Sequence, residues 1–232
     1  DLHSFPTRRS SDLRTCADVG FAYDGDADRL IVVDEKGRII DGDRVLCICG
    51  KYLKDIGKLA EGKITATVMS NIGLHKYLEQ HGIDVDVTKV GDRYVLESML
   101  QTGSVLGGEQ SGHMIFLDYT TTGDGVLSSL QFMKAYLASG SKLSELRDEI
   151  HIYPQALVNA GVDNAYKQAA LEDEEVKEFI GKVEAKLEGT GRVLIRPSGT
   201  EPLIRVMLEG EDSEEIRGYA EQIAELIHKK FG

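Results

Sequence analysis

The chain has few cysteines, only short apolar runs and no excess of positive charge. Three cysteines occur in 232 residues, and Cys16, Cys47 and Cys49 do not have the spacing of a metal site. A sparse, odd cysteine count is typical of a reducing compartment. Cys47 and Cys49 lie in a stretch with a helical pattern and are predicted to be packing residues.

The short apolar runs exclude a membrane-spanning helix, and no signal-peptide pattern occurs at the start of the sequence. We therefore expect a cytoplasmic protein that does not act at a membrane. With 27 basic against 39 acidic residues, the net charge is −12, which argues against nucleic-acid binding. An anionic small substrate would need local arginines to overcome this field.

Residues 1–13 differ from the rest of the chain because they have no apolar period. They resemble a translated sequencing-adapter oligonucleotide, so we treat them as a non-native segment and exclude them from the fold prediction. On this interpretation the authentic protein is longer at its amino end, and this chain is a fragment.

From residue 14 onward, short apolar runs alternate with amphipathic stretches, which predicts a parallel α/β sheet followed by a second unit that starts near Pro154. The predicted strands are Val19–Tyr23, Leu30–Val33, Arg38–Ile40, Lys63–Val68, Asp84–Thr88, Val105–Gly107, Ala156–Val162, Arg192–Ile195 and Leu203–Leu208. The predicted helices are 42–56, 71–81, 92–100, 126–138, 173–187 and 214–231.

Three carboxylates alternate in the loop between the first two predicted strands, residues 24–29, which we call the acidic loop. Asp24, Asp26 and Asp28 occupy alternate positions and can converge on one point. A hard divalent cation would relieve their repulsion, and magnesium is commonly held by a few carboxylates plus a phosphate. Arg29 adds a fixed positive charge, so the pattern indicates metal-assisted phosphoryl transfer.

Two other interpretations of the acidic loop are available. Asp-Gly pairs are common in solvated hairpin turns. An EF-hand would use Asp24, Asp26, Asp28 and Glu35, but the turn glycine that it requires is replaced by Arg29, and the flanking segments resemble strands.

Residues 196–202, which we call the basic loop, carry several groups that bind phosphate. Gly199 allows close backbone approach, Ser198 and Thr200 offer hydroxyl donors, and Arg196 with Arg205 can grip phosphate bidentately. The alternative is an ordinary tight turn with exposed arginines, which two bracketing prolines make less attractive.

Two further segments have weaker patterns. The glycine-rich loop, residues 107–113, places Glu109 and Ser111 where they suit sugar hydroxyls, and His113 could transfer a proton or contact phosphate. Lys89 and Arg93 flank a predicted helix start that could hold an anion. Alone, each segment is equally consistent with a structural loop, a buried histidine or a solvated helix cap.

In this order the four segments resemble the α-D-phosphohexomutase superfamily. The matching stretches are Asp24-Gly25-Asp26-Ala27-Asp28-Arg29, Thr88-Lys89-Val90-Gly91-Asp92-Arg93-Tyr94, Gly108-Glu109-Gln110-Ser111-Gly112-His113 and Arg196-Pro197-Ser198-Gly199-Thr200-Glu201-Pro202. The resemblance extends from about Asp18 to the carboxyl end. Gln110 favours the glucosamine branch, because phosphomannomutase/phosphoglucomutase relatives tend to have methionine there.

The resemblance implies a mixed α/β, three-layer phosphohexomutase-type domain followed by a smaller α+β carboxyl-terminal domain. Residues 14–40 would end domain two with the metal loop. Residues 41–152 would be domain three with the sugar loop, and residues 154–232 would be domain four with the phosphate loop. The implied reaction interconverts glucosamine 6-phosphate and glucosamine 1-phosphate through a phosphoserine and a bisphosphate intermediate, towards UDP-N-acetylglucosamine.

The resemblance also implies roles for single residues. Asp24, Asp26 and Asp28 would bind Mg²⁺, and Arg29 would stabilise the transferring phosphoryl group, with His113 and Lys89 as further catalytic candidates. The implied substrate-binding residues are Glu109, Ser111, Arg93, Arg196, Ser198, Gly199, Thr200 and Arg205.

The chain departs from the family pattern because it has no Thr-Ala-Ser-His-Asn-Pro-like motif, which carries the family's nucleophilic serine. We therefore expect this chain alone to bind magnesium weakly and to have no mutase activity. Two alternatives remain open: a phosphomannomutase/phosphoglucomutase that acts on unaminated hexose phosphates, and a non-catalytic module that binds sugar phosphates.

Overall fold

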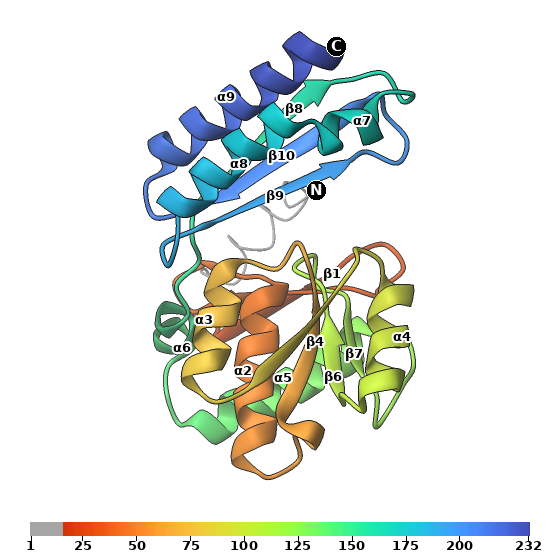
Figure 1. Cartoon of the computed structure of the whole chain (residues 1–232). Helices are drawn as coiled ribbons and strands as arrows, with labels where there is room; N and C mark the ends of the chain where they lie inside the picture. The colour runs from red at the N-terminus through yellow and green to blue at the C-terminus, as the bar shows by residue number, and fades with distance from the viewer. Residues whose placement is uncertain (1–15) are drawn as a thin grey trace. The chain divides into compact units, whose positions relative to one another are not determined.

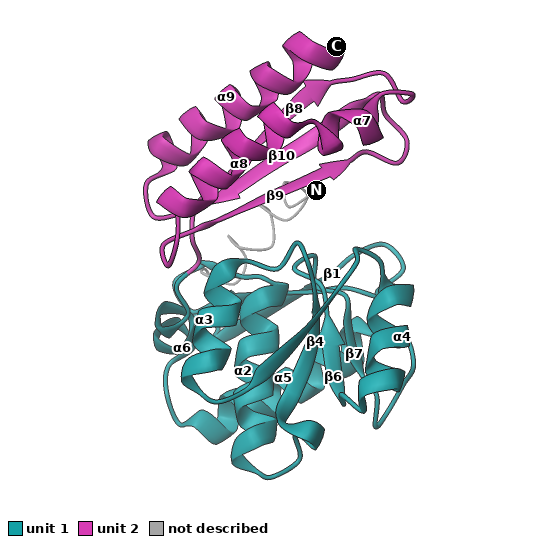
Figure 2. Cartoon of the chain, in the orientation of Figure 1, with its two compact units in different colours: residues 1–151 teal, residues 152–232 magenta. Residues whose placement is uncertain are grey.

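A computed structural model describes residues 16–232 and divides the chain into two compact units, residues 1–151 and 152–232 (Figure 2). The segment predicted to be non-native lies outside the described residues. Among the residues that are described, no helix is both long and apolar enough to cross a membrane.

Within residues 16–151, the first unit holds two sheets, five α-helices and one 3₁₀ turn; Figure 1 shows how these elements are arranged. Its strands are β1 (Val19–Tyr23), β2 (Leu30–Asp34), β3 (Ile39–Ile40), β4 (Lys63–Thr67), β5 (Asp84–Thr88), β6 (Leu106–Gly108) and β7 (Met114–Phe116). Its helices are α2 (Gly42–Asp55), the 3₁₀ turn η2 (Ala60–Gly62), α3 (Ile72–Gln80), α4 (Asp92–Thr102), α5 (Gly125–Ser139) and α6 (Leu143–Glu149).

The larger sheet of this unit has the order β5-β4-β6-β7 and is covered on both faces. Neighbouring residues of a strand point to opposite faces. A Cβ at Gly50 of α2 would lie 3.9 Å from Leu106, whereas one at Gly107 would meet Val95 and Met99 of α4. Helices α2 and α4 therefore pack on opposite faces, and the three-layer prediction is confirmed (Figure 1).

The prediction of a parallel sheet holds for three of its four strands. Strands β5 and β6 pair parallel to β4, but β7 runs antiparallel to β6. The connection between β6 and β7 is the short glycine-rich loop, and a connection of a few residues can only join antiparallel neighbours. The smaller sheet, β1-β2-β3, is antiparallel throughout.

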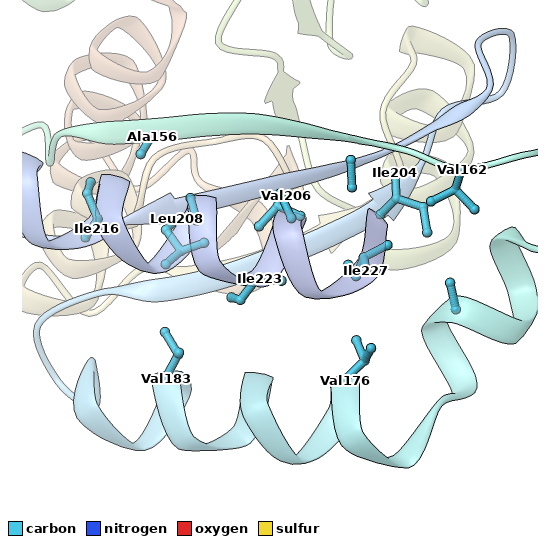
Figure 3. Packing of buried hydrophobic residues seen from close by; sticks show 14 of the residues in the cluster. Ala156, Val162, Val176, Val183, Ile204, Val206, Leu208, Ile216, Ile223 and Ile227 are labelled. Carbon is cyan, nitrogen blue, oxygen red and sulfur yellow. The ribbon is translucent and has the colours of Figure 1, made fainter. Parts of the chain in front are cut away.

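The second unit is an antiparallel sheet of order β8-β10-β9, packed against helices. Its elements are β8 (Gln155–Gly161), α7 (Lys167–Glu172), α8 (Glu174–Lys186), β9 (Arg192–Pro197), β10 (Leu203–Glu209) and α9 (Ser213–Phe231). Alternate residues of β10, namely Ile204, Val206 and Leu208, face the helices and meet isoleucines of α9 (Figure 3). The core thus occupies one face of the sheet.

Two short helices, α6 and α7, were not predicted, because they contain only one or two turns and show no clear apolar period. The structure assigns Cys47 and Cys49 to α2, where both are buried, as the packing interpretation requires. Burial raises the pKa of the Cys49 thiol to about 12, which makes it unreactive at neutral pH.

Candidate active site

The acidic loop closes the hairpin of β1 and β2, whose last paired residues are Tyr23 and Leu30. Its three aspartates each offer one carboxylate oxygen, and these oxygens lie within 4.8 Å of one another. The flanking elements are strands rather than helices, so the EF-hand interpretation fails. The convergence predicted from the alternating spacing is present.

The electrostatics of the acidic loop favour a bound cation. Burial, and then the side chain of Asp24, raise the pKa of Asp28 above its ordinary value. The pKa of Asp24 is lowered instead. Burial would raise it, but the backbone N–H of Arg29 donates a hydrogen bond to the carboxylate and lowers it. Asp28 Oδ1 is buried and accepts no hydrogen bond from a described residue. A divalent cation would satisfy this oxygen and relieve the repulsion.

Arg29 lies beside these carboxylates and remains accessible. Its Nε is 3.6 Å from Asp24 Oδ2 and 3.9 Å from Asp28 Oδ1, and about half of its side chain is exposed. Both distances are long for charge-assisted hydrogen bonds. The guanidinium is therefore near the aspartates without being fully engaged by them, and it can turn toward an incoming anion.

His113, by contrast, is buried and uses both ring nitrogens. The backbone N–H of Gly123 donates to His113 Nε2 at 3.1 Å, and Nδ1 lies 3.0 Å from Asp28 Oδ2. Because Nε2 accepts a hydrogen bond, the proton of the neutral ring is on Nδ1 and is donated to Asp28. With 4% of the residue exposed, this arrangement favours orienting the Asp28 carboxylate over contacting phosphate.

Two glycines of the segment before α5 pack against the back of the acidic loop. A Cβ at Gly123 would overlap the imidazole of His113, and one at Gly125 would lie 2.6 Å from the carbonyl oxygen of Arg29. The N–H of Gly125 donates to the carbonyl of Ala27 at 2.8 Å, and Ala27 has a positive φ of 60°. Sequence reasoning missed these glycines. The Gly-Asp-Gly sequence was the available signal, since glycine permits close backbone approach.

The glycine-rich loop lies directly beside the acidic loop. Arg29 and His113 form an isolated antiparallel bridge, and the N–H of Leu30 donates to the carbonyl of Gly112 at 2.9 Å. The N–H of Gly91 donates to Glu109 Oε1 at 3.0 Å. The first unit therefore brings together three of the four predicted segments.

Not all predicted residues in these segments are equally available. Ser111, Lys89 and Arg93 are exposed. Lys89 lies over the ring of Tyr94, with Nζ 5.9 Å from its centroid, and Arg93 Nε donates to Glu97 at 2.7 Å along the surface of α4. Ser111 and Lys89 could reach a ligand as they stand, whereas Arg93 would first have to leave Glu97.

The fourth segment, the basic loop, joins β9 to β10 in the second unit. Arg196 and Arg205 are direct cross-strand partners, so their side chains share one face of the sheet. Arg205 pairs with Glu201 at 2.9 Å. Arg196 has no carboxylate within 4.0 Å among residues 16–232, and burial, then the charge of Arg205, lower its pKa. A bound anion would relieve this pair of like charges.

Ser198 is buried in this loop, and its hydroxyl accepts from the N–H of Glu201 at 3.2 Å. Gly199 and Thr200 are exposed, and their backbone N–H groups donate to no residue in the described part of the chain. Two backbone N–H groups of this turn are therefore available as donors, while the Ser198 hydroxyl stabilises the turn itself.

Two family models match the chain. Residues 41–153 match "Phosphoglucomutase/phosphomannomutase, alpha/beta/alpha domain III", and residues 157–226 match the C-terminal domain of the same family. The chain belongs to the phosphoglucomutase/phosphomannomutase family. The resemblance that the motifs indicated, and the predicted fold class, are thereby confirmed.

Curated relatives with high identity are named phosphoglucosamine mutase. The protein of Geobacillus kaustophilus is 54% identical over 216 residues, and that of Caldanaerobacter subterraneus is 56% identical over 215 residues. In each case the match covers 93% of this chain and 48% of the relative. The chain therefore spans about half the length of these relatives.

Solved structures show the same fold at low identity. A phosphoglucomutase/phosphomannomutase family protein of Burkholderia thailandensis superposes with a TM-score of 0.76 at 21% identity, over 100% of this chain and 52% of that one. N-acetylphosphoglucosamine mutase of Aspergillus fumigatus, solved with GlcNAc-6P and magnesium, gives 0.73 at 20% identity, over 91% and 49%.

Proposed function

We propose that this chain is the carboxyl-terminal half of a phosphohexomutase that interconverts glucosamine 6-phosphate and glucosamine 1-phosphate. The observation that carries the proposal is the convergence of three aspartate oxygens within 4.8 Å, beside Arg29 and the glycine-rich loop. The names of the relatives at more than 50% identity support the glucosamine substrate, as does Gln110 in the glycine-rich loop.

In this proposal each loop has one task. Asp24, Asp26 and Asp28 hold Mg²⁺, which when bound offsets the negative charge of the transferring phosphoryl group. Arg29, half exposed beside the aspartates, stabilises that charge from the protein side. His113 keeps Asp28 oriented through its Nδ1 proton, as the residues behind a metal ligand commonly do.

The remaining residues bind the sugar phosphate. Glu109 and Ser111 would form hydrogen bonds with sugar hydroxyls. Lys89 and Arg93 would contact the anion once it is bound. The basic loop would hold the phosphate that does not react, through the free N–H groups of Gly199 and Thr200 and through Arg196 and Arg205. The phosphoserine would come from the part of the longer protein that this chain does not contain.

The test compares this chain with the full-length protein recovered from the genomic sequence. With glucosamine 6-phosphate, magnesium and a catalytic amount of glucose 1,6-bisphosphate, phosphorus NMR should show glucosamine 1-phosphate only for the full-length protein. Formation of this product by the 232-residue chain alone contradicts the assignment of the phosphoserine to the missing half. Absence of product from the full-length protein contradicts the proposed function.

The same assay distinguishes the alternatives. Faster turnover of glucose or mannose 6-phosphate than of glucosamine 6-phosphate would favour the phosphomannomutase/phosphoglucomutase branch. Binding of the sugar phosphate without turnover of any of the three by the full-length protein would favour a non-catalytic module.

A further inference from the structure

Lys167, the first residue of α7, lies behind the basic loop, far from it in sequence. The ammonium group donates to the carbonyl oxygen of Ser198 at 2.6 Å and to that of Glu201 at 2.5 Å. Only 8% of the residue is exposed. Lysine at this depth is uncommon unless its charge is compensated, so its position requires a reason.

No carboxylate of residues 16–232 lies within 4.0 Å of the Lys167 ammonium, so its charge is met only by the dipoles of two carbonyl groups. Arg196 stands in the same loop without a carboxylate, and Arg205 opposes it across the strand pair. Three cationic side chains therefore lie at one turn, and of these only Arg205 pairs with a carboxylate among residues 16–232, that of Glu201. A dianion bound at the turn would balance this excess.

The hydrogen bonds of Lys167 also orient a peptide unit. The carbonyl of Ser198 and the N–H of Gly199 belong to one planar trans peptide, in which the two groups point in opposite directions, and the described chain has no cis peptide bonds. Because the Ser198 carbonyl points to Lys167, the N–H of Gly199 points away from it. Gly199 is exposed and its N–H donates to no described residue, so this N–H is available to a ligand.

We propose that Lys167 is a positioning residue for phosphate binding: it fixes the Ser198–Gly199 peptide with the N–H outward and adds a buried positive charge behind it. This inference rests on the proposed role of the basic loop and extends it to α7. The ligand is the phosphate monoester group of the sugar phosphate, which offers several acceptor oxygens and two negative charges. Lys167 acts through the loop backbone and does not touch the ligand.

The experiment titrates the 232-residue chain with inorganic phosphate at low ionic strength, where charge effects are least screened, and follows backbone amides by NMR. In the wild type the amide resonances of Gly199 and Thr200 should shift with phosphate. Lys167→Met should weaken phosphate binding by about tenfold or more and move the free Gly199 resonance, because both the charge and the two hydrogen bonds are lost.

Two further variants separate charge from folding. Lys167→Arg retains the charge and the donors and should recover most of the affinity, whereas Lys167→Gln retains a neutral donor and should recover the Gly199 resonance better than the affinity. The matched control is Lys177→Met, at an exposed lysine of α8 that pairs with Glu174, and it should leave binding within about twofold. The Arg and Gln variants still decide the question should the Met variant fail to fold.

The outcomes distinguish this inference from the function on which it rests. If the wild-type Gly199 and Thr200 amides shift with phosphate but Lys167→Met and Lys167→Gln bind equally well with an unmoved Gly199 resonance, the role of Lys167 is overturned and the basic loop keeps its proposed function. If the wild-type amides do not respond to phosphate, both are overturned.

Discussion

The acidic and basic loops have the same construction and opposite charge. Each joins two antiparallel strands, β1 to β2 and β9 to β10, and each is held from behind by a buried side chain distant in sequence. The acidic loop is held by the imidazole of His113, which carries no net charge when its Nε2 accepts a hydrogen bond. The basic loop is held by the ammonium of Lys167.

Under the proposed function, the difference between the two supports suits the charge that each loop needs. A cation behind the aspartates would neutralise the charge that attracts a metal, whereas a neutral donor orients Asp28 and leaves that charge intact. Behind the arginines, a cation adds to the charge that attracts an anion. Each support therefore orients its loop without cancelling the loop's electrostatic potential.

The largest expected effect comes from adding one carbon behind the acidic loop. In Gly123→Ala the new Cβ would overlap the His113 ring, and the buried ring and Asp28 must shift with it. We expect Mn²⁺ affinity, measured by electron paramagnetic resonance, to fall by up to about 100-fold. The free energy of unfolding should fall by about 1–3 kcal/mol, as for other overpacked core sites.

Gly25→Ala is the matched control because it adds the same carbon inside the acidic loop, where nothing lies within 4 Å. Its Mn²⁺ affinity and stability should remain close to those of the wild type. Equal effects of the two substitutions would mean that the acidic loop is sensitive to any added carbon and that Gly123 has no special position.

A smaller effect is expected from variants that test whether His113 orients Asp28 for Mn²⁺ binding. His113→Ala removes the donor to Asp28 and should weaken Mn²⁺ binding by about tenfold. His113→Asn places an amide N–H near the position of Nδ1 and should recover most of this loss. If both variants bind as the wild type does, Asp28 is oriented without help from the imidazole.

The sequence predicted the two loops better than their supports. Alternating carboxylates and a Ser-Gly-Thr turn flanked by arginines are local patterns, so the grouping of carboxylates at residues 24–29 and of cationic and N–H groups around residues 196–202 could be predicted from them alone. His113 was recognised, but its partners Asp28 and Gly123 lie 85 and 10 residues away. These two partners decide which ring nitrogen of His113 accepts a hydrogen bond, and a local sequence pattern does not reveal them.

Lys167 and β7 show the same limit. A lysine that begins a six-residue helix resembles a solvated residue, and only the return of the chain at Ser198 buries it. The reversal of β7 was also missed, although the short glycine-rich connection before it excludes a parallel crossover. The prediction therefore failed mainly where a feature depends on contacts between residues that are far apart in the sequence, and less often because of local propensities.

The two loops should also differ in their response to pH. Burial and the neighbouring Asp24 side chain raise the pKa of Asp28 above 3.8, so protons should begin to displace Mn²⁺ above the pH at which an isolated aspartate titrates. The positive charge at the basic loop comes mainly from guanidinium groups, which are not deprotonated in proteins. We expect Mn²⁺ affinity to fall as the pH is lowered, starting at a higher pH than for an aspartate with an ordinary pKa, while sulfate binding at Gly199, followed by amide NMR, stays constant.

The stability of the metal-free protein should change with the opposite sign. A carboxyl group whose pKa is raised in the folded state contributes stability below its unfolded value, and this contribution is lost as pH rises through the folded pKa. Asp28→Asn should therefore flatten this part of the stability profile, measured by urea unfolding without metal. A profile that is unchanged in this variant would contradict the raised pKa of Asp28.

The smallest expected effect concerns the repulsion between Arg196 and Arg205, which bound phosphate should relieve. Arg196 and Arg205 face each other across β9 and β10, and like charges in such pairs cost roughly 0.2–1 kcal/mol. Without phosphate, Arg196→Gln should raise the free energy of unfolding by an amount in this range. With excess phosphate the wild type should instead have the higher free energy of unfolding, because phosphate binding stabilises it more than it stabilises Arg196→Gln. Arg217→Gln, at an exposed position of α9, should show no such reversal, and loss of stability by Arg196→Gln without phosphate would contradict the stored repulsion.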